Sequence, residues 1–233
     1  MHFADNFVVH LARNLLFAAL AMFAVASPHA RGDVGITPTL ARVIVLHQGE
    51  AVWVERNPDP FNLIDPDFSL TSRPCPPYCI QPMQLAAGVE TLGELELLDA
   101  MRRIGREEDI LLIDSREADW IARSGMIPGA IHLPWTELHP AHNDPEKIAE
   151  LLQFKFGVTR HAGLWNFEHA KTLVFYCNGP WCGQSPTNIR QLLALGYPAQ
   201  RLKWYRGGMQ AWKALGFNTV RPDPSRMDAT DRH

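Results

Sequence analysis

The sequence has little cysteine, no excess of charge of either sign and no long apolar run. Its 233 residues include only 4 cysteines, too few for a fold built on disulfides. The 22 Lys and Arg residues face 25 Asp and Glu residues, so a net charge of −3 offers no basic face to nucleic acid or to an anionic membrane. These absences exclude a disulfide scaffold, a nucleic-acid-binding protein and a polytopic membrane protein.

The apolar stretch at residues 15–26 is typical of the core of a secretory signal. It has twelve residues, whereas a bilayer-spanning helix needs about 20. Arg13 precedes it, and Ala24-Val25-Ala26 has the small-x-small pattern of a cleavage site. We therefore expect residues 1–26 to be a signal peptide and the protein to be periplasmic or secreted, with no membrane contact after cleavage. A buried N-terminal helix is the alternative.

The rest of the chain falls into three segments. Residues 27–90 are expected to form an N-terminal extension wrapped on the main domain, with a β-hairpin at 40–56 and then a proline-dense stretch that suits neither a helix nor a central strand. Residues 91–220 alternate helix and strand signals. Residues 221–233 mix charges and prolines and are expected to be a mobile tail.

The alternating segment predicts an α/β domain with a mostly parallel sheet flanked by helices. Thr91 and Glu94 form a capping-box pattern that predicts a helix to about residue 101. Short apolar runs predict strands at 110–113, 130–133, 173–176 and 201–205. Helices are expected at 145–156, at 208–215 and after Ser185-Pro186, with Ser185 as N-cap and Gly196 as C-cap.

Cys177 stands at the end of one of these apolar strands and is the strongest candidate for chemistry. The carboxyl edge of an open α/β sheet is where ligands bind. The loop that follows Cys177 leads into a helix N-terminus, and its backbone N–H groups can form an anion cradle that favours a thiolate. The candidate cradle residues are Asn178, Gly179, Pro180, Trp181 and Gly183. A structural disulfide or a buried free thiol would place a cysteine there equally well.

Residues 91–217 resemble a single rhodanese (sulfurtransferase) domain at four places in order. These are the segment Leu112 to Glu117 with its Asp-x-Arg pattern, the turn Gly125-Met126-Ile127-Pro128-Gly129-Ala130-Ile131, the strand Phe175-Tyr176-Cys177 with its loop, and Gly207-Gly208-Met209-Gln210-Ala211-Trp212. The resemblance implies that Cys177 takes sulfur from a sulfane-sulfur donor, carries it as a persulfide and passes it to a thiol acceptor. It also implies that Asp114 and Arg116 support the site, and that no cofactor or metal is needed.

The loop departs from the family pattern in its charge. Members active on thiosulfate often carry basic residues here, but no Lys or Arg occurs between Lys171 and Arg190, and Cys182 occupies a position that is often Arg. The loss of that charge is expected to weaken capture of a divalent anion, and Arg206 is a candidate to supply a charge from another loop. Cys182 could instead resolve or modulate a persulfide on Cys177.

Cys75 and Cys79 form a second pair within the proline-dense stretch. They are candidates for a disulfide that pins the extension, for a docking site of a periplasmic redox protein, or for a copper or zinc site. His139 and His142 are expected to be surface residues. We assign no metal site.

Three functions remain open from the sequence. The first is a sulfurtransferase that uses Cys177, with Cys182 as a resolving or modulating thiol. The second is a thiol–disulfide redox protein that uses the Cys177/Cys182 pair. The third is a non-catalytic module whose loop binds an anion or a partner protein.

Overall fold

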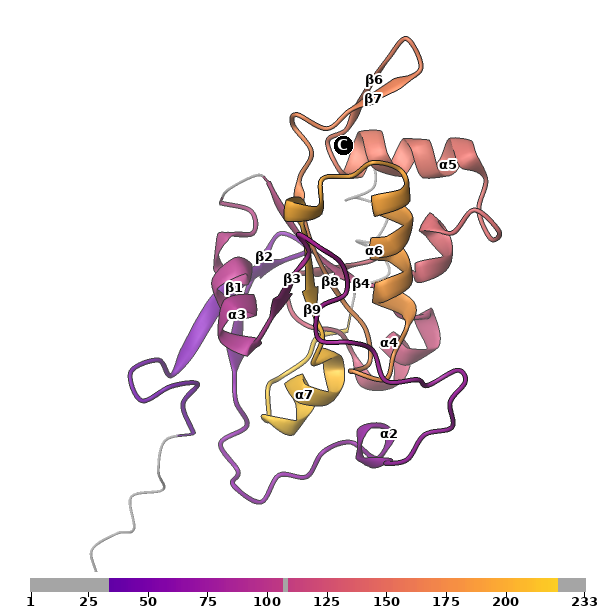
Figure 1. Cartoon of the computed structure of the whole chain (residues 1–233). Coiled ribbons are helices and arrows are strands. Elements are labelled where there is room, and N and C mark those ends of the chain that lie inside the picture. The colour runs from indigo at the N-terminus through magenta and orange to yellow at the C-terminus, as the bar shows by residue number, and fades with distance from the viewer. Residues whose placement is uncertain (1–33, 107–108, 222–233) are drawn as a thin grey trace, which may run out of the picture. The chain divides into compact units, whose positions relative to one another are not determined.

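Five parallel strands form the central sheet of the domain. A computed structural model describes residues 34–106 and 109–221, which belong to one unit of the chain (Figure 1). In spatial order the strands are β3 (Glu90–Leu92), β9 (Leu202–Tyr205), β8 (Thr172–Tyr176), β4 (Ile110–Asp114) and β5 (Ala130–His132). All neighbouring pairs are parallel, which confirms the predicted α/β class. The predicted signal peptide and all but the first residue of the predicted tail lie outside the described residues.

The two faces of the sheet bury two separate apolar clusters. Along β8, Val174 and Tyr176 belong to one cluster, whereas Leu173 and Phe175 belong to the other, because successive side chains of a strand point to opposite faces. Helices α3 (Glu94–Arg103), α4 (Ala118–Ser124) and α7 (Gly208–Ala214) contribute to the first cluster. Helices α5 (Pro145–Glu150) and α6 (Gln184–Ala194) contribute to the second. Burial on both faces explains why the strands read as continuous apolar runs.

The predicted N-terminal hairpin is present and packs on the first face. Strand β1 (Arg42–His47) pairs antiparallel with β2 (Glu50–Glu55). Val43, Val45 and Val54 point inward into the first apolar cluster. The turn residues Gln48 and Gly49 have φ values of 49° and 82°, the positive values that a two-residue hairpin turn requires.

Two helix starts differ from the sequence-based predictions. Thr91 belongs to edge strand β3, so the predicted capping box is wrong, and α3 begins at Glu94 with Gly93 as its N-cap. The Thr91 hydroxyl donates instead to the carbonyl of Met83 over 2.5 Å. Helix α6 has Gly183 as N-cap, so Ser185 lies inside the helix.

The remaining described residues include several short helices and strands. The proline-dense stretch contains one helical turn, α2 (Pro66–Ser69), with Pro66 in the first turn, where its missing N–H costs nothing. The remaining elements are the 3₁₀ helices η1 (Trp135–Leu138) and η3 (Ala199–Arg201), the π-helix η2 (Leu151–Lys155), and a second, unpredicted hairpin of β6 (Thr159–His161) and β7 (Leu164–Asn166). Within the described ranges, no helix combines the length and apolarity needed to cross a bilayer.

Candidate active site

Cys177 lies at the carboxyl edge of the sheet, directly after the central strand β8. The thiol is free, and the residue is 2% exposed. The following loop runs to Gly183, the N-cap of α6, so it ends at the positive end of a helix. The sequence-based placement of Cys177 at the end of a buried strand therefore agrees with its position in the structure.

Hydrogen bonds around Cys177 favour the thiolate. Burial disfavours the charged form and is the largest single influence, which by itself would raise the pKa of Cys177. Hydrogen bonds from the Cys182 thiol, from the backbone and hydroxyl of Ser185 and from the backbone of Gly179 outweigh it, and the pKa of Cys177 is lowered. Cys177 is thus shifted toward the thiolate, which is the nucleophilic form of a cysteine.

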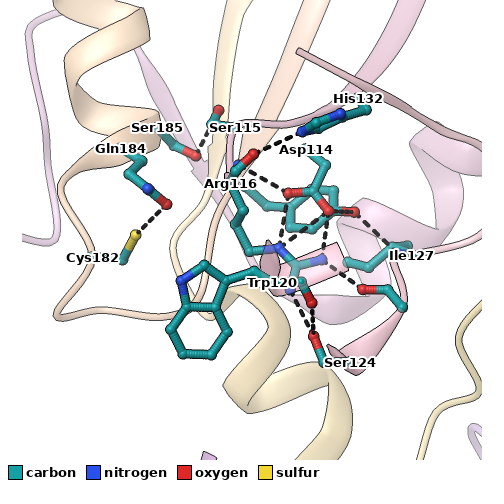
Figure 2. Close-up of polar contacts among 12 residues, drawn as sticks. Asp114, Ser115, Arg116, Trp120, Ser124, Ile127, His132, Cys182, Gln184 and Ser185 are labelled. Atoms are coloured by element: carbon teal, nitrogen blue, oxygen red, sulfur yellow. Dashed lines mark hydrogen bonds and ion pairs between the residues drawn. The ribbon is translucent and has the colours of Figure 1, made fainter. Parts of the chain in front are cut away.

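Cys182 has the opposite character and stays protonated. Burial, the hydrogen bond to Cys177 and the negative charge of the Cys177 thiolate all raise the pKa of Cys182 well above its ordinary value. Its sulfur also lies 3.5 Å from Oε1 of Gln184 (Figure 2). Its carbonyl oxygen lies 3.4 Å from Sγ of Cys177. The thiol of Cys182 thus has Gln184 as an acceptor, and the shift of its pKa is opposite to that of Cys177.

The start of helix α7 holds the active-site loop from behind. The backbone N–H groups of Met209 and Gln210 donate to the carbonyls of Cys177 and Asn178 over 3.0 and 2.9 Å. This approach requires glycine at 208, which has a φ of 55° and where a Cβ would lie 2.4 Å from the carbonyl oxygen of Cys177. The Gly207-Gly208 pair singled out in the sequence thus has a role in seating the loop.

Asp114 and Arg116 form a fully buried ion pair beside the loop, without touching Cys177. Nε and Nη2 of Arg116 donate to both carboxylate oxygens of Asp114 over 2.7 to 3.2 Å (Figure 2). Nη1 and Nη2 also donate to the Ser124 hydroxyl and to the carbonyl of Gly125. Burial opposes the charged guanidinium, but the carboxylate of Asp114 outweighs it, and the pKa of Arg116 is raised.

This ion pair is connected to the strand that carries Cys177. The hydroxyl of Tyr176 donates to Oδ2 of Asp114 over 2.7 Å and accepts from the backbone N–H of Ile127. The adjacent Ser115 accepts a hydrogen bond from the hydroxyl of Ser185 over 3.1 Å (Figure 2). The ends of β4 and β8 and the start of α6 are thereby held together immediately around the nucleophile.

The N-terminal extension forms one wall of the site. Cys75 and Cys79 form a disulfide with their Cα atoms 4.6 Å apart. Between them, Tyr78 meets the Trp181 ring edge-on at 5.5 Å, and the guanidinium of Arg73 lies 4.0 Å from the centre of the same ring. Sequence reasoning had placed Trp181 in the loop but had not connected Tyr78 and Arg73 with it.

Polar contacts of the backbone join the extension to the loop. The N–H of Gln81 donates to the carbonyl of Pro180 over 2.8 Å. The guanidinium of Arg206 donates to the carbonyls of Gln81 and Pro82, so Arg206 contacts the extension. Gln210 accepts from Nε1 of Trp181 over 2.8 Å and donates to the carbonyl of Phe68.

An aromatic pocket of about 360 Å³ lies between the loop and the extension. Four aromatic side chains line it, and none of its lining residues is charged. The lining residues are Pro77, Tyr78, Trp120, Trp135, Asn178, Trp181, Cys182, Gly183, Gln184 and Thr187. Among residues 34–106 and 109–221, no three His, Cys, Asp or Glu side chains are grouped so that they could hold a metal ion.

Sequence reasoning missed three residues that act around Cys177. Ser185 was assigned to capping, whereas its hydroxyl donates to Ser115 and its backbone contributes to the lowered pKa of Cys177. Tyr176 was treated as an apolar strand residue, although a phenol at the end of a buried strand beside Asp114 signals a hydrogen bond. Tyr78 could have been suspected only from its place in an otherwise apolar Cys-x3-Cys stretch.

Comparisons with known proteins agree with this architecture. The family model described as the rhodanese-like domain matches residues 96–215. A comparison with curated proteins found no match. Similar solved structures include a Rhodopseudomonas palustris protein of unknown function described as a possible tyrosine phosphatase (22% identity, 58% of this chain and 88% of that one, TM-score 0.40).

Two further solved structures are sulfurtransferases by description. A human single-domain sulfurtransferase is 24% identical over 55% of this chain and 96% of its own, with a TM-score of 0.33. An Escherichia coli 3-mercaptopyruvate sulfotransferase is 20% identical over 50% of this chain and 39% of its own, with a TM-score of 0.33. At these scores the structural likenesses add no argument about the chemistry of the site.

Proposed function

The chain belongs to the rhodanese-like domain family, and on this premise we propose that it is a sulfurtransferase that carries sulfane sulfur as a persulfide on Cys177. The observation that carries the proposal is the environment of Cys177. A buried cysteine with a lowered pKa stands at the carboxyl edge of the central strand, within a loop whose hydrogen bonds converge on its sulfur. These are the properties of an activated thiolate nucleophile.

Sulfur transfer occurs in two steps. The Cys177 thiolate attacks the outer sulfur of a donor such as thiosulfate; a new S–S bond forms, the old one breaks, and sulfite leaves with the bonding electrons. An acceptor thiolate then attacks the outer sulfur of the persulfide and releases the Cys177 thiolate. The hydrogen-bond donors around Cys177 stabilise the anionic sulfur in both steps.

Cys182 modulates this chemistry by donating a hydrogen bond. Its raised pKa keeps it in the thiol form, which supports donation to the Cys177 thiolate over attack on a persulfide. The alternative is a thiol–disulfide redox protein that cycles between the free pair and a Cys177–Cys182 disulfide. A third reading is a non-catalytic module, which predicts that Cys177→Ser leaves partner binding intact.

Export to the periplasm, or secretion, is part of the same proposal. The leader pattern at residues 1–26 supports it, as does the Cys75–Cys79 disulfide, because such bonds persist in oxidising compartments. The partners are then a sulfane-sulfur donor and a thiol acceptor in that compartment, with a periplasmic redox protein as a candidate for keeping Cys177 and Cys182 reduced.

Intact mass spectrometry tests the proposal directly. Protein is purified without reductant, reduced at Cys177 and Cys182, freed of the reductant and mixed with a sulfane-sulfur donor. We expect a gain of the mass of one sulfur atom, which an added acceptor thiol then removes. A loss of two hydrogens with no sulfur uptake would contradict the persulfide carrier and favour the redox protein.

Two substitutions test whether Cys182 acts as a hydrogen-bond donor or as a partner in a functional disulfide. Cys182→Ser keeps a hydrogen-bond donor, whereas Cys182→Ala removes it, so only alanine should raise the pKa of Cys177. The measurement is the pH dependence of alkylation by iodoacetamide, with the midpoint of the wild type expected below the ordinary range of about 8.5 for a free thiol. Both variants should still take up sulfur. Loss of uptake in Cys182→Ser would instead show that the disulfide is the functional state.

A further inference from the structure

The aromatic pocket beside the loop has no charged residue in its lining. Its lining holds no Lys, Arg, Asp or Glu, and four of its residues are Tyr78, Trp120, Trp135 and Trp181. A small dianion gains nothing from such a lining, because no cationic side chain among the lining residues pairs with it. An aromatic lining is suited to a flat or apolar group, which gains free energy by leaving water.

The aromatic rings are also poorly suited to a cation. The guanidinium of Arg73 lies 4.0 Å from the centre of the Trp181 ring, and that of Arg123 lies 4.5 Å from the centre of the Trp120 ring. Each of these rings already binds a positive charge, which repels a second one nearby. A cationic group is therefore disfavoured in the pocket.

The pocket borders the loop that follows Cys177. Cys182 lines it, and the carbonyl oxygen of this residue lies 3.4 Å from Sγ of Cys177. Asn178 and Gly183 of the same loop also line it. A group seated in the pocket thus contacts residues of the loop that follows Cys177.

The opposite wall comes from the extension, which the matched family region 96–215 does not include. Pro77 and Tyr78 line the pocket and lie between the two disulfide-bonded cysteines. The disulfide closes this wall on itself, and the N–H of Gln81, which donates to the carbonyl of Pro180, holds it against the loop. The pocket is therefore a feature of this chain rather than of the matched region alone.

We propose that this pocket binds the uncharged aromatic or apolar group of an organic sulfane-sulfur donor, R–SO₂–S⁻ being the type of compound that tests it. The inference rests on the proposed function and specifies its donor. The Cys177 thiolate attacks the outer sulfur, the S–S bond to the sulfonyl group breaks, and the sulfinate R–SO₂⁻ leaves with the electron pair. No external oxidant or reductant is required.

The test compares benzenethiosulfonate, methanethiosulfonate and thiosulfate as donors to the full reduced protein. The first two share the reacting group and its charge, so their ratio of kcat/KM isolates the contribution of R. We expect benzenethiosulfonate to exceed methanethiosulfonate by at least about tenfold, which corresponds to burial of one ring. Tyr78→Ala and Trp135→Ala should reduce this ratio toward one.

Trp53→Ala is the matched control for these variants. Trp53 is a half-exposed tryptophan of strand β2 that, like Trp181, has a guanidinium over its ring, and it does not line the pocket. This variant should keep the wild-type ratio. A ratio near one in the wild type, or a higher kcat/KM with thiosulfate than with both thiosulfonates, would overturn the proposal.

A binding measurement separates this proposal from the sulfurtransferase proposal. Calorimetric titration of Cys177→Ser protein with benzenesulfinate requires no turnover, and we expect binding that Trp135→Ala weakens. If no donor transfers sulfur but this binding is seen, the proposed function fails and the assignment of the pocket stands. If sulfur transfer occurs without binding or ring preference, the assignment of the pocket fails alone.

Discussion

Replacing Cys177 by serine should abolish sulfur uptake, with a loss of at least about 10³-fold in the rate of persulfide formation. The hydroxyl of serine fits the same space but does not ionise at neutral pH, so the hydrogen bonds from Ser185, Gly179 and Cys182 have no thiolate to stabilise. The measurement is the intact mass of the reduced variant after exposure to a sulfane-sulfur donor. The mass should be unchanged.

Cys182→Ser is the matched control for this experiment. It makes the same sulfur-to-oxygen change five positions further along the same loop, and it should take up sulfur as the wild type does. Sulfur uptake by Cys177→Ser together with its loss in Cys182→Ser would reverse the two roles. That result would also contradict the opposite shifts in the pKa values of Cys177 and Cys182.

Replacing Arg116 by alanine should lower the free energy of unfolding more than any other substitution proposed at the site. The substitution leaves the carboxylate of Asp114 buried without its partner, and removing one member of a buried ion pair costs about 3–5 kcal/mol. The hydrogen bonds to Ser124 and Gly125 are lost as well. Chemical denaturation followed by tryptophan fluorescence should show this decrease in the free energy of unfolding.

Arg42→Ala provides the comparison for an exposed ion pair. Arg42 lies 3.7 Å from Glu55, with both side chains about half exposed. Exposed pairs contribute about 0–1 kcal/mol, so this variant should unfold close to the wild type. Similar losses in Arg42→Ala and Arg116→Ala would show that the Asp114–Arg116 pair is not critical for the stability of the site.

Four of the five strands of the sheet could be predicted from the sequence because they are local patterns, whereas edge strand β3 was not predicted. The apolar runs that end at Ile113 and Tyr176 contain no polar residue that competes with burial, and both are strands of the central sheet. The hairpin was predictable for a similar reason, since the turn around Gly49 separates two β-rich runs. Each of these signals lies within a few neighbouring residues.

The errors concern residues whose partners are distant in the sequence. Thr91 and Glu94 satisfy the capping-box pattern, but Thr91 pairs with Trp204 of strand β9 and is a strand residue. Ser185 could cap a helix by its type, but its hydroxyl donates to Ser115, 70 positions away in the sequence. In each case a long-range contact overrides a local preference.

In the candidate site, too, local features could be predicted and long-range contacts could not. The position of Cys177 and the glycine pair at the start of α7 could be recognised in the sequence, because both lie in short motifs. The aromatic wall could not, because it depends on the contacts of Tyr78 and Arg73 with Trp181. No pattern of spacing connects a proline-dense stretch with a loop so far along the chain.

The anchoring of the loop by α7 has a consequence for the order in which the site is assembled. The N–H groups that hold the carbonyls of Cys177 and Asn178 belong to residues 209 and 210, and Arg206 contacts Gln81 across 125 positions of the chain. Closing such long loops has an entropic cost that is recovered only when the distant partners exist. During synthesis the cysteine therefore emerges before the residues that seat its loop. A chain that ends before α7 therefore contains Cys177 without the two backbone donors that hold its loop.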